Sequence, residues 1–218
     1  MERVAAVFGS TGLIGNQLLQ LLSDNKNYIK VLAYMRKPAS NLPVKVSAVE
    51  LTNDFALPAD VDDVYVCIGT TMKKAGSKEA FLKVDFELVQ TIAQRAKAAG
   101  AKRLLVVSSI GANAESSNFY LRTKGQMEEA VKQYGFTLCG IVRPSLLLGK
   151  RDEFRFGEKV GVFFYKVFGF IFVGPLRKYK GIYAVDVAKS MVMLALSSSG
   201  TITVESNVLK QMADVYKS

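Results

Sequence analysis

Residues 3–15 read Arg-Val-Ala-Ala-Val-Phe-Gly-Ser-Thr-Gly-Leu-Ile-Gly, and this stretch decides the fold. The apolar run Val4–Phe8 has the composition of a strand that is buried on both faces of a parallel sheet. Glycines follow it at three-residue spacing, and an amphipathic stretch, Leu18–Leu22, comes next. This order predicts a strand, a tight turn and the start of a helix, where free N–H groups attract a pyrophosphate. We therefore interpret the stretch as a dinucleotide-binding turn.

The three glycines of this turn each have a physical reason. Gly9 lets the chain turn with backbone angles that other residues avoid. Gly12 has no side chain that would keep a phosphate away from the backbone, and Gly15 lets the new helix pack closely on the strand. We expect six consecutive residues of the turn to contact the cofactor: Gly9, Ser10, Thr11, Gly12, Leu13 and Ile14.

Composition predicts one domain spanning residues 1–218, and half of the chain is apolar. Lys and Arg number 29 against 19 Asp and Glu, so the net charge of +10 favours an anionic partner such as a phosphorylated cofactor. The positive charges are scattered and lack interleaved aromatics, which argues against nucleic-acid binding. The chain has no histidine, and its two cysteines, Cys67 and Cys139, lie in separate apolar runs. We expect buried free thiols and no metal site.

The compartment and the surroundings of the protein can also be predicted. Met1 leads directly into the first strand without a signal peptide, and free thiols suit a reducing environment, so we expect a cytoplasmic protein. The longest apolar segment, Val160–Pro175, is too short to span a bilayer and contains Lys166. The sequence thus predicts no transmembrane segment, leaves contact with a membrane surface open, and favours a monomer or homodimer.

Strand-like and helix-like stretches alternate along the rest of the chain. This alternation predicts an α/β fold: a doubly wound parallel sheet with helices on both faces. A small Phe-rich lobe over the cofactor is expected at residues 149–182. Further strands are predicted at Ile29–Tyr34, Val44–Glu50, Val64–Ile68, Leu104–Val107, Phe136–Val142 and Thr201–Val204. Further helices are predicted at Lys78–Ala99, Asn118–Gln133, Asp186–Leu196 and Asn207–Val215.

The carboxyl ends of these strands are where a ligand binds in such a fold. Arg36 ends the second strand, about twenty residues beyond Gly15, where a carboxylate would bind the ribose hydroxyls of NAD. An arginine there suits a 2′-phosphate, and Lys37 adds a second positive charge, so we predict NADP(H) as the cofactor. Residues that end the next two strands are expected to line the adenine, ribose and phosphates: Leu51, Thr52, Gly69, Thr70 and Thr71.

Candidate catalytic groups follow the fifth strand. Tyr120 and Lys124 are four apart in a predicted helix and share one face, while Ser108 and Ser109 end the preceding strand. A lysine ammonium beside a phenol stabilises the phenolate and lowers the pKa of the tyrosine. The phenol can then exchange a proton with a carbonyl oxygen that a serine hydroxyl holds, as a hydride arrives.

Taken together, these motifs resemble an atypical short-chain dehydrogenase/reductase, most closely the Tat-interacting-protein-like oxidoreductases. The resemblance covers residues 3 to about 190 and implies a Rossmann fold, NADP binding and a Ser-Tyr-Lys active site. It also implies that Arg143, Pro144 and Ser145 flank the nicotinamide, with Ser145 standing where many relatives have glycine. Spacing in this branch favours Ser108 as the catalytic serine, whereas analogy with longer relatives favours Ser109. Supporting stretches are 68–76, Val84-Asp85, 108–112, 116–125 and 146–151.

The sequence leaves two functions open. The first is an NADPH-dependent reductase of a small carbonyl compound. The second is an NADPH-binding redox sensor or scaffold that acts through partners without significant turnover. The intact serine pair, Tyr120 and Lys124 favour the first, because a sensor has no chemical need for them.

Overall fold

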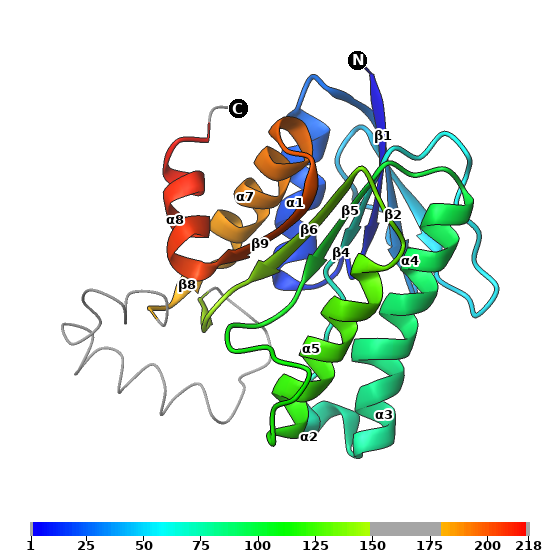
Figure 1. Ribbon diagram of the computed structural model, residues 1–218. Coiled ribbons are helices and arrows are strands. Elements are labelled where there is room, and N and C mark those ends of the chain that lie inside the picture. Colours follow the sequence, from blue (N-terminus) through cyan, green and yellow to red (C-terminus); the bar gives the residue numbers. More distant parts are fainter. Residues whose placement is uncertain (1, 149–179, 217–218) are drawn as a thin grey trace.

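The computed structural model describes residues 2–148 and 180–216, and its centre is one parallel sheet (Figure 1). Every neighbouring pair of described strands in this sheet is parallel, so all carboxyl ends share one edge. The strand order reverses direction between β1 and β4, which creates the crevice where such folds bind ligands. The order is β3 (Val46–Glu50), β2 (Tyr28–Met35), β1 (Arg3–Phe8), β4 (Asp63–Val66), β5 (Arg103–Val107), β6 (Leu138–Arg143) and β9 (Gly200–Glu205).

Helices cover both faces of the sheet and enclose two apolar cores. One face carries α1 (Leu13–Asp24), α7 (Ala184–Ser197) and α8 (Ser206–Asp214), and the other carries α4 (Leu88–Ala98) and α5 (Phe119–Lys132) (Figure 1). Side chains of β1 alternate between the cores, with Val7 in the first and Phe8 in the second. The predicted doubly wound α/β fold is confirmed.

The predicted helix Lys78–Ala99 is wrong as a single helix. It is divided into α3 (Lys78–Leu82), a π-helical turn η1 (Lys83–Glu87) and α4. A short helix, α2 (Met72–Ala75), precedes it. A single regular helix was expected to place Val84, Leu88, Ile92 and Ala96 on one apolar face. Ile92 and Ala96 are buried as expected, but Val84 and Leu88 are only half-buried. The buried positions are Phe81, Asp85 and Val89 instead, because the wider π turn rotates the residues before it.

Aromatic side chains replace a helix beside β1 and β2. The connections 36–45 and 51–62, both fully described, contain no helix. Phe55 fills the space instead and packs at 5.3 Å against the ring of Phe8, which is stacked on Tyr34 at 4.3 Å. The guanidinium of Arg95 lies 4.4 Å from the Phe55 ring and covers it.

A two-stranded parallel pair, β7 (Leu147–Leu148) and β8 (Ile182–Tyr183), lies on either side of the segment that is not described. The predicted Phe-rich lobe therefore falls outside the described residues except for 180–182, and so does the apolar segment Val160–Pro175. Within the described part of the chain, no helix is long and apolar enough to cross a bilayer.

Both thiols are free. Cys139 is buried, as expected, and burial raises its pKa to about 11. Cys67 is only half-buried against the core of α1 and α7.

Candidate functional site

The turn between β1 and α1 cannot accommodate side chains at its first and last glycines. Gly9 has a positive φ of 78°, and a Cβ there would lie 2.6 Å from the carbonyl carbon of Cys67. A Cβ on Gly15 would lie 2.2 Å from the carbonyl oxygen of Gly9. The Gly12 N–H donates to that same oxygen at 2.9 Å, and α1 begins directly after Gly12. This tight turn into a helix N-terminus fits a pyrophosphate.

Some of the other residues of the turn pack within the protein, and others are exposed. Ser10 is buried, and its hydroxyl donates to the Tyr34 carbonyl at 3.3 Å, which ties the turn to β2. Thr11 and Gly12 are exposed, whereas Leu13 is half-buried. The Ile14 side chain packs in the core beneath α1, so only its backbone remains for a ligand. The exposed backbone at 11–12 is the accessible part of the turn.

The two predicted phosphate-binding cations lie at the carboxyl edge of the sheet. Arg36 and Lys37 come directly after β2 and are exposed. Next to them, Leu51 follows β3, is half-buried, and donates its N–H to the Met35 carbonyl at 2.9 Å. Thr52 is exposed. These four residues thus surround the ends of β2 and β3, on the side of the crevice where the adenosine half of a dinucleotide lies.

A buried carboxylate contacts both the loop after β4 and the predicted catalytic lysine. Asp85 of η1 accepts a hydrogen bond from the Thr70 N–H at 2.8 Å, and its other oxygen lies 2.7 Å from the Lys124 ammonium. Asp85 is fully buried and Lys124 is 4% exposed. Gly69 lies against this pair, and the Thr71 hydroxyl caps α2 by accepting from the Lys74 N–H at 3.1 Å.

Tyr120 lies in the first turn of α5, one turn before Lys124. The helix begins there because the Asn118 side chain caps it, accepting from the Leu121 N–H at 3.2 Å. The Tyr120 ring is half-buried and packs at 5.6 Å against the buried ring of Phe81 in α3. No residue in the described ranges forms a hydrogen bond with the Tyr120 hydroxyl.

The serine pair at the end of β5 separates into a buried and an accessible hydroxyl. Ser108 is buried and donates to Glu128 of α5 at 2.5 Å. Glu128 is itself fully buried and accepts two hydrogen bonds from Arg143, at 2.9 and 2.5 Å. These bonds raise the pKa of Arg143 further. Ser109 is half-buried, and its hydroxyl makes only a long contact of 3.4 Å with the Ile110 carbonyl.

The segment after β6 is anchored on both sides. The buried Pro144 accepts from the Ile110 N–H at 3.1 Å, which holds the ends of β5 and β6 together. The Ser145 hydroxyl donates to the Lys180 carbonyl at 2.5 Å and lies 2.9 Å from the Ser206 hydroxyl. In place of glycine, Ser145 therefore links β6 to the chain entering β8 and to the start of α8.

The predicted residues thus meet at one edge of the sheet, but three side chains of the site were not predicted. They are Phe81, Asp85 and Glu128. A carboxylate on the buried face of a helix was the signal available for two of them, since Asp85 lies between Phe81 and Val89, and Glu128 lies between Met127 and Val131. Among the described residues, no cluster of three or more His, Cys, Asp or Glu could hold a metal ion.

Comparison with solved structures supports this architecture. The oxidoreductase ylbE from Lactococcus lactis superimposes with a TM-score of 0.64 at 19% identity, covering 97% of this chain and 95% of that one. A UDP-N-acetylglucosamine 4-epimerase from Bacillus cereus gives a TM-score of 0.66 at 17% identity, covering 96% and 83%. At these identities the likeness shows the fold, a Rossmann-like α/β sheet.

Named relatives correct one expectation. The chain is 38% identical over 155 residues to "Protein FMP52-1, mitochondrial" of Scheffersomyces stipitis, covering 68% of this chain and 69% of that protein. It is 35% identical over 207 residues to "Protein FMP52, mitochondrial" of Kluyveromyces lactis, covering 90% and 91%. The expected cytoplasmic localisation is contradicted by these mitochondrial names. Free thiols indicate a reducing compartment but do not distinguish one such compartment from another.

A family described as NAD(P)H-binding matches residues 9–161, from the first glycine of the turn past the end of β7. That span includes the glycine turn, the Arg36 region, the Asp85–Lys124 pair and both serines. The match shows an NAD(P)H-binding domain over this part of the chain. The chain belongs to this NAD(P)H-binding family, and within it to the FMP52 proteins.

Proposed function

We propose that this protein is an NADPH-dependent oxidoreductase that reduces a small carbonyl compound. The observation that carries the proposal is the pairing of Tyr120 with Lys124 on α5. The tyrosine hydroxyl has no described partner, and the lysine ammonium one turn later is buried and ion-paired. Both lie at the sheet edge that carries the glycine turn, which is the arrangement that proton transfer beside a bound nicotinamide requires.

The cofactor would be held by the turn and by the cations after β2. The exposed backbone at 11–12 would take the pyrophosphate, and the glycine contacts leave no room for side chains that would block it. Arg36 and Lys37 are exposed and positive where the 2′-phosphate of NADP lies in this fold. When bound, the cofactor supplies the hydride.

The chain's own groups would handle the proton and the substrate oxygen. Tyr120 would donate the proton to the carbonyl oxygen, and the positive charge of Lys124 would stabilise the phenolate that remains. Lys124 would also hold the nicotinamide ribose. Phe81 packs against the Tyr120 ring and would fix the direction of its hydroxyl.

The two serines would have different roles. The Ser108 hydroxyl is committed to Glu128, whereas Ser109 is accessible and weakly bonded. We assign the carbonyl-holding role to Ser109 and a structural role to Ser108. Ser109→Ala is expected to lower turnover by about 10²-fold or more, as for a lost oxyanion donor. Ser108→Ala is expected to lower stability more than turnover, and equal losses of turnover in both variants would contradict the assignment.

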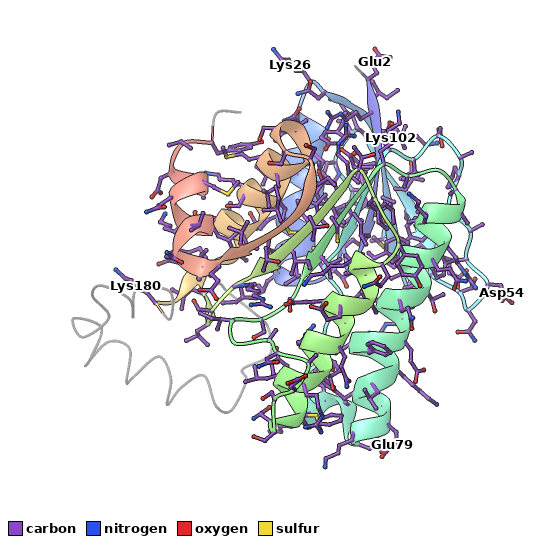
Figure 2. The ribbon with its side chains drawn as sticks, viewed as in Figure 1. Glu2, Lys26, Asp54, Glu79, Lys102 and Lys180 are labelled. Atoms are coloured by element: carbon purple, nitrogen blue, oxygen red, sulfur yellow. The ribbon has the colours of Figure 1, made fainter. Side chains whose placement is uncertain are left out.

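Cofactor preference tests the proposal without knowledge of the substrate. We expect tighter binding of NADPH than of NADH in calorimetric titration. Arg36→Ala removes a charge-assisted contact to the 2′-phosphate and should weaken NADPH binding by about 10- to 100-fold, with little effect on NADH. Lys26→Ala is the matched control, because Lys26 lies at the other end of β2 (Figure 2). Equal affinity for the two cofactors, or an Arg36→Ala variant that binds NADPH like the native chain, would contradict the proposal.

The alternative function is a sensor that binds NADPH without turnover. A turnover assay on the same native protein distinguishes this sensor from the proposed reductase. Binding of NADPH together with reduction of any compound in a panel of aldehydes, ketones and quinones supports the reductase. The Tat-interacting-protein-like resemblance agrees with either outcome, so the decision depends on the turnover measurement.

A further inference from the structure

The loop between β5 and α5, residues 109–118, lies directly on the backbone of α5. Gly125, in the middle of that helix, is buried at the contact. A Cβ built on Gly125 would lie 2.1 Å from the Ala114 nitrogen and 2.2 Å from the Asn113 carbonyl carbon, so no side chain fits there. Glycine inside a helix is unfavourable compared with alanine. The close approach of the loop is therefore the reason for a glycine at this position.

Hydrogen bonds fasten the loop to the same part of α5. The Asn113 N–H donates to the Leu121 carbonyl at 3.1 Å. Further along the loop, the Arg122 guanidinium donates to the Ser116 carbonyl at 2.7 Å and to the Ser117 carbonyl at 3.2 Å. The second half of the loop is thus bound to the first two turns of α5.

The loop begins with Ser109, to which the carbonyl-holding role is assigned above. The Ser109 carbonyl accepts the Ala112 N–H at 3.1 Å, and Gly111 has a φ of 79°, so the chain forms a closed turn here. The Ile110 N–H donates to the Pro144 carbonyl at 3.1 Å. Ser109 is therefore held from two sides, by the end of β6 and, through the turn, by the surface of α5.

The surface on which the loop rests adjoins the proposed catalytic side chains. Successive residues of an α-helix are rotated by about 100°, and residues four apart share a face. The face of Leu121 and Gly125 is therefore next to the face of Tyr120 and Lys124. Because the loop lies on this neighbouring face, the distance between loop and helix affects how far Ser109 lies from Tyr120.

We infer that Gly125 is a positioning residue: its missing side chain lets the loop approach α5 closely enough for the Ser109 and Tyr120 hydroxyls to reach one carbonyl oxygen. The inference rests on the proposed function, which assigns those two roles. With a methyl group at Gly125, the loop would have to retreat by more than about 1 Å to restore van der Waals contact. A misplacement of about 1 Å at reacting groups can cost about 10²-fold in rate.

A double-mutant cycle with Ser109 tests this role. Gly125→Ala adds one methyl group at the contact, and Ser109→Ala removes the hydroxyl that the loop positions. Single-turnover oxidation of NADPH is measured for the native chain, both single variants and the double variant. The substrate is the aldehyde, ketone or quinone that the native chain reduces fastest. We expect Gly125→Ala to slow hydride transfer about 10²-fold in the native chain and less than about threefold in the Ser109→Ala chain.

Two further measurements separate positioning from a general structural role. NADPH affinity, measured by calorimetry, should stay within about twofold of native in Gly125→Ala, since the change affects the reacting geometry and not cofactor binding. Amide hydrogen exchange reports the loop itself, and the Asn113 N–H should exchange at least about tenfold faster in this variant.

The matched control is Gly140→Ala in β6. A Cβ there would first meet the Leu105 side chain, at 3.4 Å, and not a backbone atom. The hydride-transfer rate, NADPH affinity and Asn113 exchange should all stay native. If Gly125→Ala does not fold by circular dichroism, Arg122→Ala replaces it in the cycle, because it removes two hydrogen bonds that hold the same loop. The same dependence on Ser109 is then expected, with a rate loss of about tenfold.

The outcomes distinguish this inference from the proposed function. A native chain that binds no NADPH, or binds it and reduces no compound in the panel, overturns the proposed function and this inference with it. A native rate in Gly125→Ala, native Asn113 exchange, or an equal rate loss with and without the Ser109 hydroxyl overturns the role of Gly125 alone. A loss of NADPH affinity as large as the rate loss also overturns that role, since the methyl group would then act on cofactor binding.

Discussion

Carboxylates are buried beside cationic side chains at both ends of the central sheet, but the hydrogen bonding around them differs between the two ends. In Figure 2, Glu2, Lys26 and Lys102 mark the amino end of the strands, and Glu79 and Lys180 lie towards the carboxyl end. The amino-edge cluster consists of Asp63 with Arg3, Arg103, Tyr28 and Tyr65. The carboxyl-edge cluster consists of Asp85 with Lys124, and of Glu128 with Arg143 and Ser108.

The amino-edge cluster is closed. Asp63 is fully buried and accepts from Tyr28 at 2.6 Å, from Arg103 at 2.8 Å and from Arg3 at 3.3 Å. Tyr28 gives its only proton to Asp63, so the Tyr65 hydroxyl, 2.7 Å away, must donate to Tyr28. Burial, with Asp63 adding to it, raises the pKa of the Tyr28 hydroxyl and keeps it protonated. The three partners of Asp63, and Tyr65 behind Tyr28, thus form their hydrogen bonds within the protein.

The carboxyl-edge cluster is incomplete by comparison. Its carboxylates hold Lys124 and Ser108 in place, but Tyr120 has no described hydrogen-bond partner and Ser109 has only a long contact. Polar groups that the protein itself satisfies stabilise the fold, whereas positioned groups without partners are available for chemistry. We therefore propose the carboxyl edge as the functional end.

The largest loss is expected at the amino edge. Asp63→Asn keeps the shape but leaves Arg3 and Arg103 without a counter-charge, which should lower the free energy of unfolding by about 3 kcal/mol. Urea denaturation measures it, with NADPH affinity of the folded fraction expected to stay native. Lys102→Gln is the control, because Lys102 is 62% exposed and pairs with Asp62 only at 3.9 Å. A loss below about 0.5 kcal/mol in Asp63→Asn would contradict a closed structural cluster.

A smaller loss of stability together with a loss of function is expected at the carboxyl edge. Glu128→Gln removes the charge that holds Arg143, whose side chain is 23% exposed and can be partly hydrated. We expect a loss of about 1–3 kcal/mol in unfolding free energy and a lowered turnover, because Ser108 and the end of β6 lose their anchor. If Glu128→Gln loses stability but keeps native turnover, this pair belongs with the structural cluster.

A still smaller effect is expected from one hydroxyl at the amino edge. Tyr28→Phe removes one donor to Asp63 and the acceptor of Tyr65, and should lower unfolding free energy by about 1–2 kcal/mol without altering NADPH affinity. Tyr183→Phe, at a residue that is 57% exposed, is the matched control and should have no measurable effect. An altered NADPH affinity in Tyr28→Phe would show that the two edges are coupled.

The sequence indicated more of the residues at the carboxyl edge of the sheet than of those in the amino-edge cluster. Glycine spacing, the residues that end each strand and the Tyr120–Lys124 spacing are local patterns. The fold brings their positions to one edge because the described strands of the central sheet are all parallel. The amino-edge cluster was not predicted, since Arg3, Tyr28, Asp63 and Arg103 come from four separate strand starts and look like ordinary flanking polar residues. The burial of Asp85 was not predicted, because a regular helix was expected where the π turn lies.

The central proposal is that Tyr120 is the proton donor of an NADPH-dependent reduction. Its test, the Tyr120→Phe substitution, has the smallest expected effect on folding stability. Tyr120→Phe removes only a hydroxyl without a described partner, so unfolding free energy and NADPH affinity should stay native. The direct measurement is single-turnover oxidation of NADPH by the native and Tyr120→Phe chains, against a panel of aldehydes, ketones and quinones. The account predicts reduction of at least one compound and a rate lower by about 10²- to 10⁴-fold in the variant. A native rate in Tyr120→Phe, or tight NADPH binding by a native chain that reduces nothing in the panel, would contradict it.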